Sequence, residues 1–510
     1  MKLINNFPAS ASAAVLSVAA AVRPVLSVFA AVAVFLMSAS AVSAQTRLPS
    51  IIGSGMVLQQ SSDVPVWGWD IPGQAVRISV SWSSDIYEAV AGSDGRWETE
   101  VSTPSAGGPF TVTVEGSQKL TLKDVLAGEV WICSGQSNMA MPVRGYTSQP
   151  VEDSYSTVLE APQYSGRIHI FNVTKDSSSV AKTDCEGRWR DATCKNVAST
   201  SAVAWGFAVR LAEALDVPVG IVVSAYGGTR IEPWVPADAL ADALEGVIPA
   251  KSIDRKLSER NVPGKKPSAA GTIYNAMIAP LAPYKAKGFL WYQGCSSRND
   301  YSHYASMQTA LVSEWRNAWR DEDASMPFIF ATIAPYSYGD ADDDVRAYFV
   351  ENQLSSLSMI PGSHAVVTEG FGEKDCIHPS RKGPVADQMA WTALATEYGM
   401  DGIPVGYPAY ERHEINGDTV TIYFSNARYG LCPSYGEPVR GFRVAGKDRV
   451  FHEAEAVIKG NPLRVEVRSG EVKAPVAVRY SFLNWCESNL TSLYGVPVPP
   501  FRTDNWPREN

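Results

Sequence analysis

The chain has 510 residues, 45% of them hydrophobic, and a formal net charge of −9 at pH 7. This length exceeds what one hydrophobic core usually serves, so we expect about three domains. The hydrophobic content is ordinary for a globular protein, and the acidic balance argues against a nucleic acid or an anionic membrane surface as partner.

The first 44 residues have the features of an export signal. Lys2 precedes an apolar stretch around residues 25–37, and small residues up to Ala44 suit cleavage by signal peptidase before Gln45. An uncleaved anchor is the alternative, because this leader is long. No later apolar run approaches the ~20 residues that span a membrane. We therefore expect a periplasmic or secreted protein with no membrane span after cleavage near Ala44.

Residues 45–123 show the pattern of an antiparallel β-sandwich. Apolar and polar residues alternate in runs such as 76–80 and 110–114, and Gly, Pro and Asp punctuate the segments between them. No helical period interrupts this region, so it is predicted to form an N-terminal β-sandwich domain.

The segment Gly-Gln-Ser-Asn-Met at 135–139 follows the apolar run 130–132. A buried strand that ends in a small-residue turn presents Ser137 at its end. A serine in that setting can be a nucleophile, and its backbone N–H can face a developing oxyanion. An ordinary turn with Ser137 as a helix cap is the alternative.

Residues 124–410 alternate strand-like runs with amphipathic helices. Apolar residues recur at spacing four over 201–215 and again over 307–319, and a third helix is predicted between 379 and 399. Such alternation predicts an α/β domain, a parallel sheet flanked by helices on both faces. In these sheets the carboxyl ends of the strands form the ligand crevice.

Two further strand ends carry glycine-rich turns, 226–229 (Tyr-Gly-Gly-Thr) and 291–294 (Trp-Tyr-Gln-Gly). Gly228 can offer a backbone N–H to a carbonyl oxygen, and Gln293 a side-chain amide. Further along, Asp375 precedes His378 by three residues, which lets a carboxylate reach an imidazole that acts as a general base. The chain has only six histidines, and the order Ser…Asp…His favours a catalytic role for this one.

Strand-like runs return over 411–510, at 420–424, 464–467 and 476–480. They predict a C-terminal β-rich module.

The motifs and their order along the chain resemble those of the sialate O-acetylesterase family, which belongs to the SGNH hydrolase superfamily. The resemblance is carried by five motifs and extends to both β-rich flanks, so that it covers nearly the whole chain after the leader. The motifs are 135–139, 227–234 (Gly-Gly-Thr-x-Ile-Glu-Pro-Trp), 274–281, 291–294 and Asp375 with His378-Pro379.

The resemblance implies a carbohydrate esterase with an SGNH-type sheet, a flavodoxin-like three-layer sandwich, and additional β-sandwich or jelly-roll-like domains. It implies Ser137 as nucleophile, His378 as base and Asp375 as its orienting partner. The oxyanion donors would be the N–H groups of Ser137 and Gly228 and the side chain of Gln293. No cofactor is expected, and no His, Cys or carboxylate cluster has the spacing of a zinc site.

One position departs from the family pattern, because Cys295 stands where Glu is common. We expect Cys295, Asn138 and Arg230 to contact substrate, with Arg230 able to pair with a sugar carboxylate. Seven cysteines cannot all pair within one chain. A disulfide and free thiols are both possible for two pairs of cysteines, Cys185 with Cys194 and Cys295 with Cys376.

We therefore predict a serine esterase that removes O-acetyl groups from carbohydrates, either sialic acids or plant-wall glycans such as xylan and xyloglucan, through an acyl-enzyme on Ser137. The rival hypothesis is a non-catalytic glycan-binding or scaffold protein with a vestigial site, supported only by Cys295. A peptidase or lipase that uses the same triad is a weaker third. The sequence does not give the oligomeric state.

Overall fold

The computed structural model describes residues 45–428, 430–433, 436–460 and 463–508. The predicted export signal lies outside these residues. Among the described helices, none combines the length and the apolarity that crossing a bilayer would require.

The central feature is a twisted sheet in the order β13-β12-β11-β7-β10-β8-β9. Its strands pair in parallel except for β9, which is antiparallel to β8. The bounds are β7 (Lys119–Gly135), β8 (Ile168–Asn172), β9 (Trp189–Asp191), β10 (Val219–Ala225), β11 (Gly288–Tyr292), β12 (Phe328–Ala331) and β13 (Ser363–Val366). The predicted parallel sheet is therefore confirmed.

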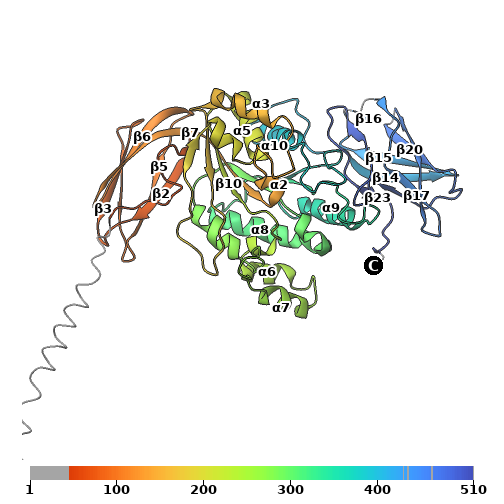
Figure 1. The fold of residues 1–510 in the computed structure, drawn as a ribbon, viewed down its shortest axis with the longest axis horizontal. Helices are drawn as coiled ribbons and strands as arrows, with labels where there is room; N and C mark the ends of the chain where they lie inside the picture. Colours follow the sequence, from red (N-terminus) through yellow and green to blue (C-terminus); the bar gives the residue numbers. More distant parts are fainter. Residues whose placement is uncertain (1–44, 429, 434–435, 461–462, 509–510) are drawn as a thin grey trace, which may run out of the picture. The chain divides into compact units, whose positions relative to one another are not determined.

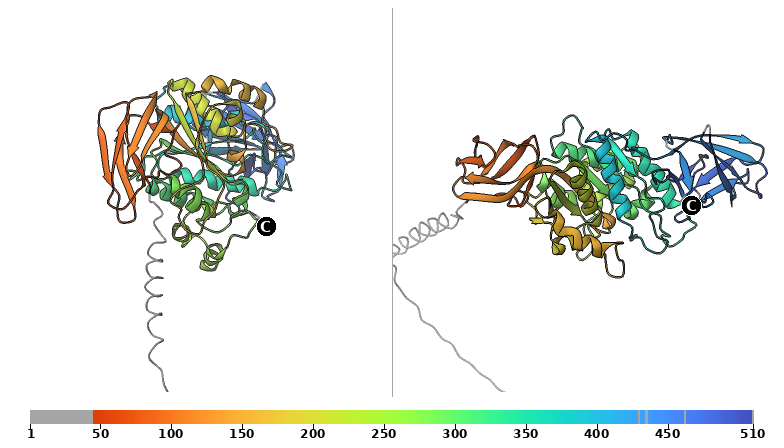
Figure 2. Two further views of the ribbon diagram at one scale, coloured as in Figure 1. Left: turned by 60° about the vertical axis from the view of Figure 1, so that its left-hand side comes forward. Right: turned by 90° about the horizontal axis from the view of Figure 1, so that it is seen from above.

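Helices cover both faces of this sheet because successive residues of β7 point in opposite directions. Val130 and Ile132 join a core with α8, and Trp131 and Cys133 join a second core with α5 and α10. Figure 1 shows α5 and α10 above the sheet and α8 below it, and the views of Figure 2 agree. The helices are α2 (Ser137–Ala140), α3 (Ser154–Glu160), α4 (Cys194–Ala198), α5 (Ala202–Leu215), α6 (Ala237–Leu244), α7 (Ala250–Ser258), α8 (Tyr304–Ala318), α9 (Val345–Ser355) and α10 (Gly383–Thr396).

The N-terminal strands pair mostly antiparallel, as the alternating sequence predicts, while β1 pairs with β7 in parallel. Strand β3 pairs with β4 and β6, β2 pairs with β5, and β6 pairs with the first half of β7. The predicted domain boundary at 123/124 falls inside β7, so one strand belongs to both sheets. The bounds are β1 (Val57–Gln59), β2 (Asp63–Trp69), β3 (Ala75–Val80), β4 (Ile86–Val90), β5 (Arg96–Ser102) and β6 (Gly107–Glu115).

The C-terminal module contains two four-stranded antiparallel sheets, β14-β15-β20-β19 and β18-β17-β21-β23, and the pair β16-β22. Its core includes Ile422, Phe442 and Val465. The bounds are β14 (Ala409–Asn416), β15 (Thr419–Ser425), β16 (Leu431–Pro433), β17 (Phe442–Ala445), β18 (Phe451–Glu453), β19 (Glu455–Lys459), β20 (Arg464–Arg468), β21 (Ala477–Tyr480), β22 (Leu490–Ser492) and β23 (Phe501–Arg502).

Candidate active site

Ser137 begins helix α2 directly after strand β7, and its side chain is only partly buried. The turn before it depends on Gly135, which has a φ of 137° and lies in the region that favours glycine. A Cβ at Gly135 would lie 2.3 Å from the carbonyl oxygen of Tyr292 on β11. Any side chain here would push the Ser137 turn away from the neighbouring strand.

The turn Gly227-Gly228 follows β10 and lies against Ser137. A Cβ at Gly227 would lie only 3.2 Å from Cβ of Ser137, and Gly228 has a φ of 79°. Glycine therefore lets this backbone approach the serine closely. The structure brings together the two strand ends that carry Ser137 and Gly228, while the role of Gly228 as an oxyanion donor stays a prediction.

His378 lies on the loop between β13 and α10, and three contacts place it beside the Ser137 turn. The ring of Tyr146 meets the His378 ring edge to face at 5.2 Å, and the Tyr146 hydroxyl donates to the carbonyl oxygen of Ser137 at 3.1 Å. Asn138 Nδ2 donates to the carbonyl oxygen of Ile377 at 3.1 Å. Residues far apart in the chain thus form one site.

The partner of His378 Nδ1 is Gln149, not Asp375. Nδ1 lies 2.8 Å from Gln149 Oε1. Asp375 is exposed, and among the described residues it forms neither a hydrogen bond nor an ion pair with His378. The predicted Asp375–His378 contact is therefore absent from this geometry, and a neutral amide occupies the position we expected for a carboxylate.

This hydrogen bond determines which ring nitrogen of His378 carries a proton. Since Oε1 of Gln149 only accepts, Nδ1 carries the proton and Nε2 is left to accept one. Burial, and then the positive charge of Lys382, hold the pKa of His378 below its ordinary value. The imidazole is thus neutral, as a general base requires, over a wider range of pH.

The structure also corrects the role expected for Gln293. This residue is fully buried, and its Nε2 donates to the carbonyl oxygen of Thr229 at 3.2 Å and to Ser297 Oγ at 3.1 Å. Its Oε1 accepts from the Tyr304 hydroxyl at 2.6 Å. Both amide protons are used inside the protein, so Gln293 braces the turn after β11 and offers no donor to an oxyanion.

Arg230 is neutralised within the protein. Its Nη2 binds Glu232 and Asp300, and Lys256 Nζ lies 2.7 Å from Glu232 Oε1 and 3.2 Å from Asp300 Oδ1. These two carboxylates balance the charges of Arg230 and Lys256, which weakens the case for the expected pairing of Arg230 with a sugar carboxylate. The geometry assigns Arg230 to linking the turn at Glu232 to Asp300, while Lys256 connects α7 to the same two carboxylates.

The other two residues expected at the substrate are buried. Asn138 is 1% exposed and uses its amide on Ile377 and on Lys382, whose Nζ donates to Asn138 Oδ1 at 2.6 Å. Cys295 is 3% exposed. It and the other six cysteines are free thiols, so neither of the two candidate disulfides is formed.

Sequence reasoning missed Tyr146, Gln149 and Lys382. Tyr146 and Gln149 lie in an irregular segment with no motif of its own, and only the fold brings it to His378. Lys382 had a local signal, because it follows His378 by four residues and forms the N-cap of α10.

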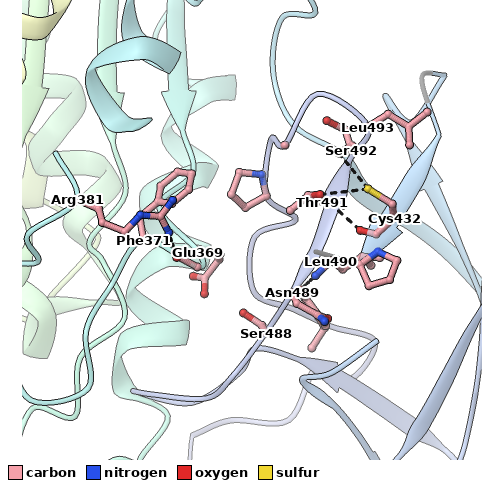
Figure 3. Close-up of a pocket in the computed structure, with 15 residues that line it drawn as sticks. Glu369, Phe371, Arg381, Cys432, Ser488, Asn489, Leu490, Thr491, Ser492 and Leu493 are labelled. Carbon is pink, nitrogen blue, oxygen red and sulfur yellow. Dashed lines mark hydrogen bonds between the residues drawn. The ribbon is translucent and has the colours of Figure 1, made fainter. Parts of the chain in front are cut away.

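A cavity of about 310 Å³ separates the His378 loop from the C-terminal module. Figure 3 shows Phe371 and Arg381 on one wall and Thr491 and Leu493 on the other. The Arg381 guanidinium lies 5.4 Å from the centre of the Phe371 ring. Beneath it, Glu369 binds the buried Arg346 and accepts from Ser481 Oγ at 2.8 Å. The module thus supports the segment that carries the histidine.

Comparisons with known proteins show which proteins this chain resembles. A family model described as "Carbohydrate esterase, sialic acid-specific acetylesterase" matches residues 127–390. The sialate O-acetylesterases of Mus musculus and Homo sapiens are each 26% identical to this chain and align over 89% of it, covering 94% and 92% of their own lengths. The crystal structure of a carbohydrate acetylesterase from Xanthomonas citri is similar at 31% identity, with a TM-score of 0.79, over 90% of this chain and 100% of that one.

Proposed function

Because the chain belongs to the sialic acid-specific acetylesterase family of carbohydrate esterases, we propose that it removes acetyl groups from O-acetylated carbohydrates through an acyl-enzyme on Ser137. The observation that carries this proposal is the meeting of the Ser137 turn with the His378 loop, through Tyr146 and through the Asn138–Ile377 hydrogen bond.

Acyl transfer begins when Ser137 Oγ attacks the acetyl carbonyl and His378 Nε2 takes the hydroxyl proton. The Nδ1–H bond to Gln149 Oε1 fixes the ring and strengthens as the imidazolium forms. The tetrahedral intermediate then collapses, and the sugar hydroxyl leaves with the proton from Nε2. Water next attacks the acetyl-serine, again with His378 as base, and acetate is released.

The oxyanion of each intermediate requires N–H donors. The proposal assigns this role to the backbone N–H groups of Ser137 and Gly228, since the Gly227-Gly228 turn lies against the serine. Gln293 is left out because its amide protons are occupied. One such donor typically contributes a factor of about 10² to 10³ in turnover.

The substrate is proposed to be an acetylated sialic acid or an acetylated plant-wall glycan. The export signal predicted for residues 1–44 would place this activity outside the cytoplasm. The test is acetate release from acetylated sialic acid, xylan and xyloglucan, with Ser137→Ala as control. Release that vanishes in Ser137→Ala supports the mechanism and identifies the glycan.

Two outcomes would contradict the proposal. Release that persists in Ser137→Ala would exclude the acyl-enzyme on this serine. Glycan binding without any release would favour the non-catalytic alternative, for which Cys295 in place of the family's common glutamate is the one supporting feature.

A further inference from the structure

We propose that Lys382 is a positioning residue of this esterase, whose buried ammonium joins the Ser137 turn to the His378 loop and acts on the base through its charge. The inference rests on the proposed function, since it concerns the same serine and histidine. Lys382 touches neither of the reacting groups directly and works through Asn138 and through space.

The connection runs through the side-chain amide of Asn138. Lys382 Nζ donates to Asn138 Oδ1 at 2.6 Å, and Asn138 Nδ2 donates to the carbonyl oxygen of Ile377 at 3.1 Å. Asn138 directly follows the nucleophile, and Ile377 directly precedes the base. The lysine therefore fixes the orientation of the amide that holds the two catalytic segments together.

Lys382 has no carboxylate partner. It is 2% exposed, and among the described residues it forms no ion pair. The groups that face it are the thiols of Cys295 and Cys376, the carboxylate of Glu373 and the imidazole of His378. Glu373 Oε1 is occupied by the backbone N–H and the hydroxyl of Ser380, at 2.7 and 2.6 Å.

Lys256, another buried lysine of the same domain, is neutralised by carboxylates, as buried lysines usually are. It is 5% exposed and pairs with both Glu232 and Asp300. An ammonium buried without such a partner is costly, because burial disfavours the charged form. Cys295 offers this lysine only a thiol whose pKa is raised by burial, and the carboxylate of Glu373, which also faces it, is engaged by Ser380.

Two electrostatic consequences follow. Burial lowers the pKa of Lys382 to about 7, so the ammonium loses its proton within the working range of an esterase. While charged, Lys382 adds to the effect of burial in lowering the pKa of His378. Below about pH 7 the charged lysine therefore helps to lower the pKa of the base, and above it the neutral amine still donates to Asn138 without opposing the imidazolium of the transition state.

The test is the pH profile of kcat/KM for 4-nitrophenyl acetate, measured on the mature protein from about pH 4 to about pH 9. The variants are Lys382→Met, Lys382→Arg and Cys295→Glu, with Lys256→Met as the matched control and thermal unfolding recorded for each. For wild type we expect an acid limb set by His378 and a second change near the pKa of Lys382.

In Lys382→Met we expect kcat/KM to fall by about 10-fold to 100-fold, because misplaced catalytic groups lose rate steeply. Its acid limb should move to higher pH and the second change should vanish. Lys382→Arg keeps its charge at all these pH values, so it should keep the low acid limb and lose the second change. Cys295→Glu gives the lysine a carboxylate, which should move the second change to higher pH.

The control Lys256→Met should lower stability and leave the profile in place. An acid limb that stays in place in Lys382→Met while the rate falls would reduce Lys382 to a structural residue and overturn the proposal. So would a profile unaltered by Cys295→Glu, which remains decisive if Lys382→Met does not fold. Activity that survives in Ser137→Ala would instead refute the proposed function itself.

Discussion

Two variants test whether Gln149, and not Asp375, is the hydrogen-bond partner of His378. Gln149→Leu removes the acceptor 2.8 Å from His378 Nδ1 and leaves a side chain of similar volume. Asp375→Asn removes the charge of the carboxylate that sequence reasoning placed there. We expect the first variant to be impaired in turnover and the second to behave like wild type.

The size of the expected loss follows from the geometry. When Ser137 gives up its proton, the Nδ1–H bond becomes a hydrogen bond from a charged donor, which contributes about 1.5 to 3 kcal/mol. A neutral bond of about 0.5 to 1.5 kcal/mol already exists in the ground state, so only the difference of about 1 to 1.5 kcal/mol affects kcat. Since about 1.36 kcal/mol corresponds to a factor of ten in rate, Gln149→Leu should lower kcat by about 5-fold to 13-fold. Asp375 is exposed, and a substitution there should stay within about 0.5 kcal/mol, roughly a factor of two.

The assay is steady-state release of acetate from 4-nitrophenyl acetate and from an acetylated sugar, with far-UV circular dichroism to establish that each variant is folded. If an aspartate oriented the base, its replacement by asparagine would cost about 10⁴ in kcat, as in a serine protease triad. A loss of that size in Asp375→Asn, with Gln149→Leu near wild type, would refute the assignment of Gln149.

The remaining predictions concern the nucleophile, its neighbouring turn, the pH limb and the network at Arg230. Ser137→Ala should abolish acetate release in a pH-stat assay while leaving the Tm unchanged, because the serine side chain is only partly buried. Gly227→Ala would place a Cβ 3.2 Å from that of Ser137, so we expect kcat to fall by about tenfold or more with little effect on KM. An unchanged kcat would show that the Ser137 turn can move to make room for the methyl group without loss of activity. Gln149→Glu puts a carboxylate at Nδ1 and should raise the pKa of His378, moving the acid limb of kcat/KM to higher pH; a limb that stays or falls would contradict this sign. Arg230→Ala should lower the Tm and leave the ratio of kcat/KM for acidic and neutral acetylated sugars unchanged, whereas a selective loss on the acidic sugar would restore its expected role in binding.

The positions of Ser137 and His378 could be predicted because each has a signature within a few residues. A buried strand followed by small residues marks the first, and a histidine before a proline and a helix marks the second. The partner of His378 could not be predicted in the same way. Gln149 lies 229 residues away from it, in an irregular segment, and only the packing of Tyr146 and His378 shows that the two regions meet.

The two kinds of sheet could likewise be predicted from local sequence patterns, but the boundary between them could not. Alternation along 110–114 and a continuous apolar run at 130–132 predict two kinds of sheet, and both are present. Their boundary is different, because β7 begins with alternating exposed and buried residues and ends fully buried. A change of pattern along the sequence therefore marks a change of environment within one strand, which a prediction made segment by segment places between two domains.

The contacts of His378 also bear on the pH at which the enzyme works. A base held by an aspartate gains a negative neighbour that stabilises its imidazolium and raises its pKa. Here the group at Nδ1 is a neutral amide, the charge that acts on the ring is the positive one of Lys382, and burial lowers the pKa further. Burial and the charge of Lys382 favour the neutral imidazole, and the neutral amide opposes them less than a carboxylate would. We therefore expect the free enzyme to keep its kcat/KM at pH values below the ordinary pKa of histidine, about 6.5, and a limb above that value would show that a carboxylate reaches the ring.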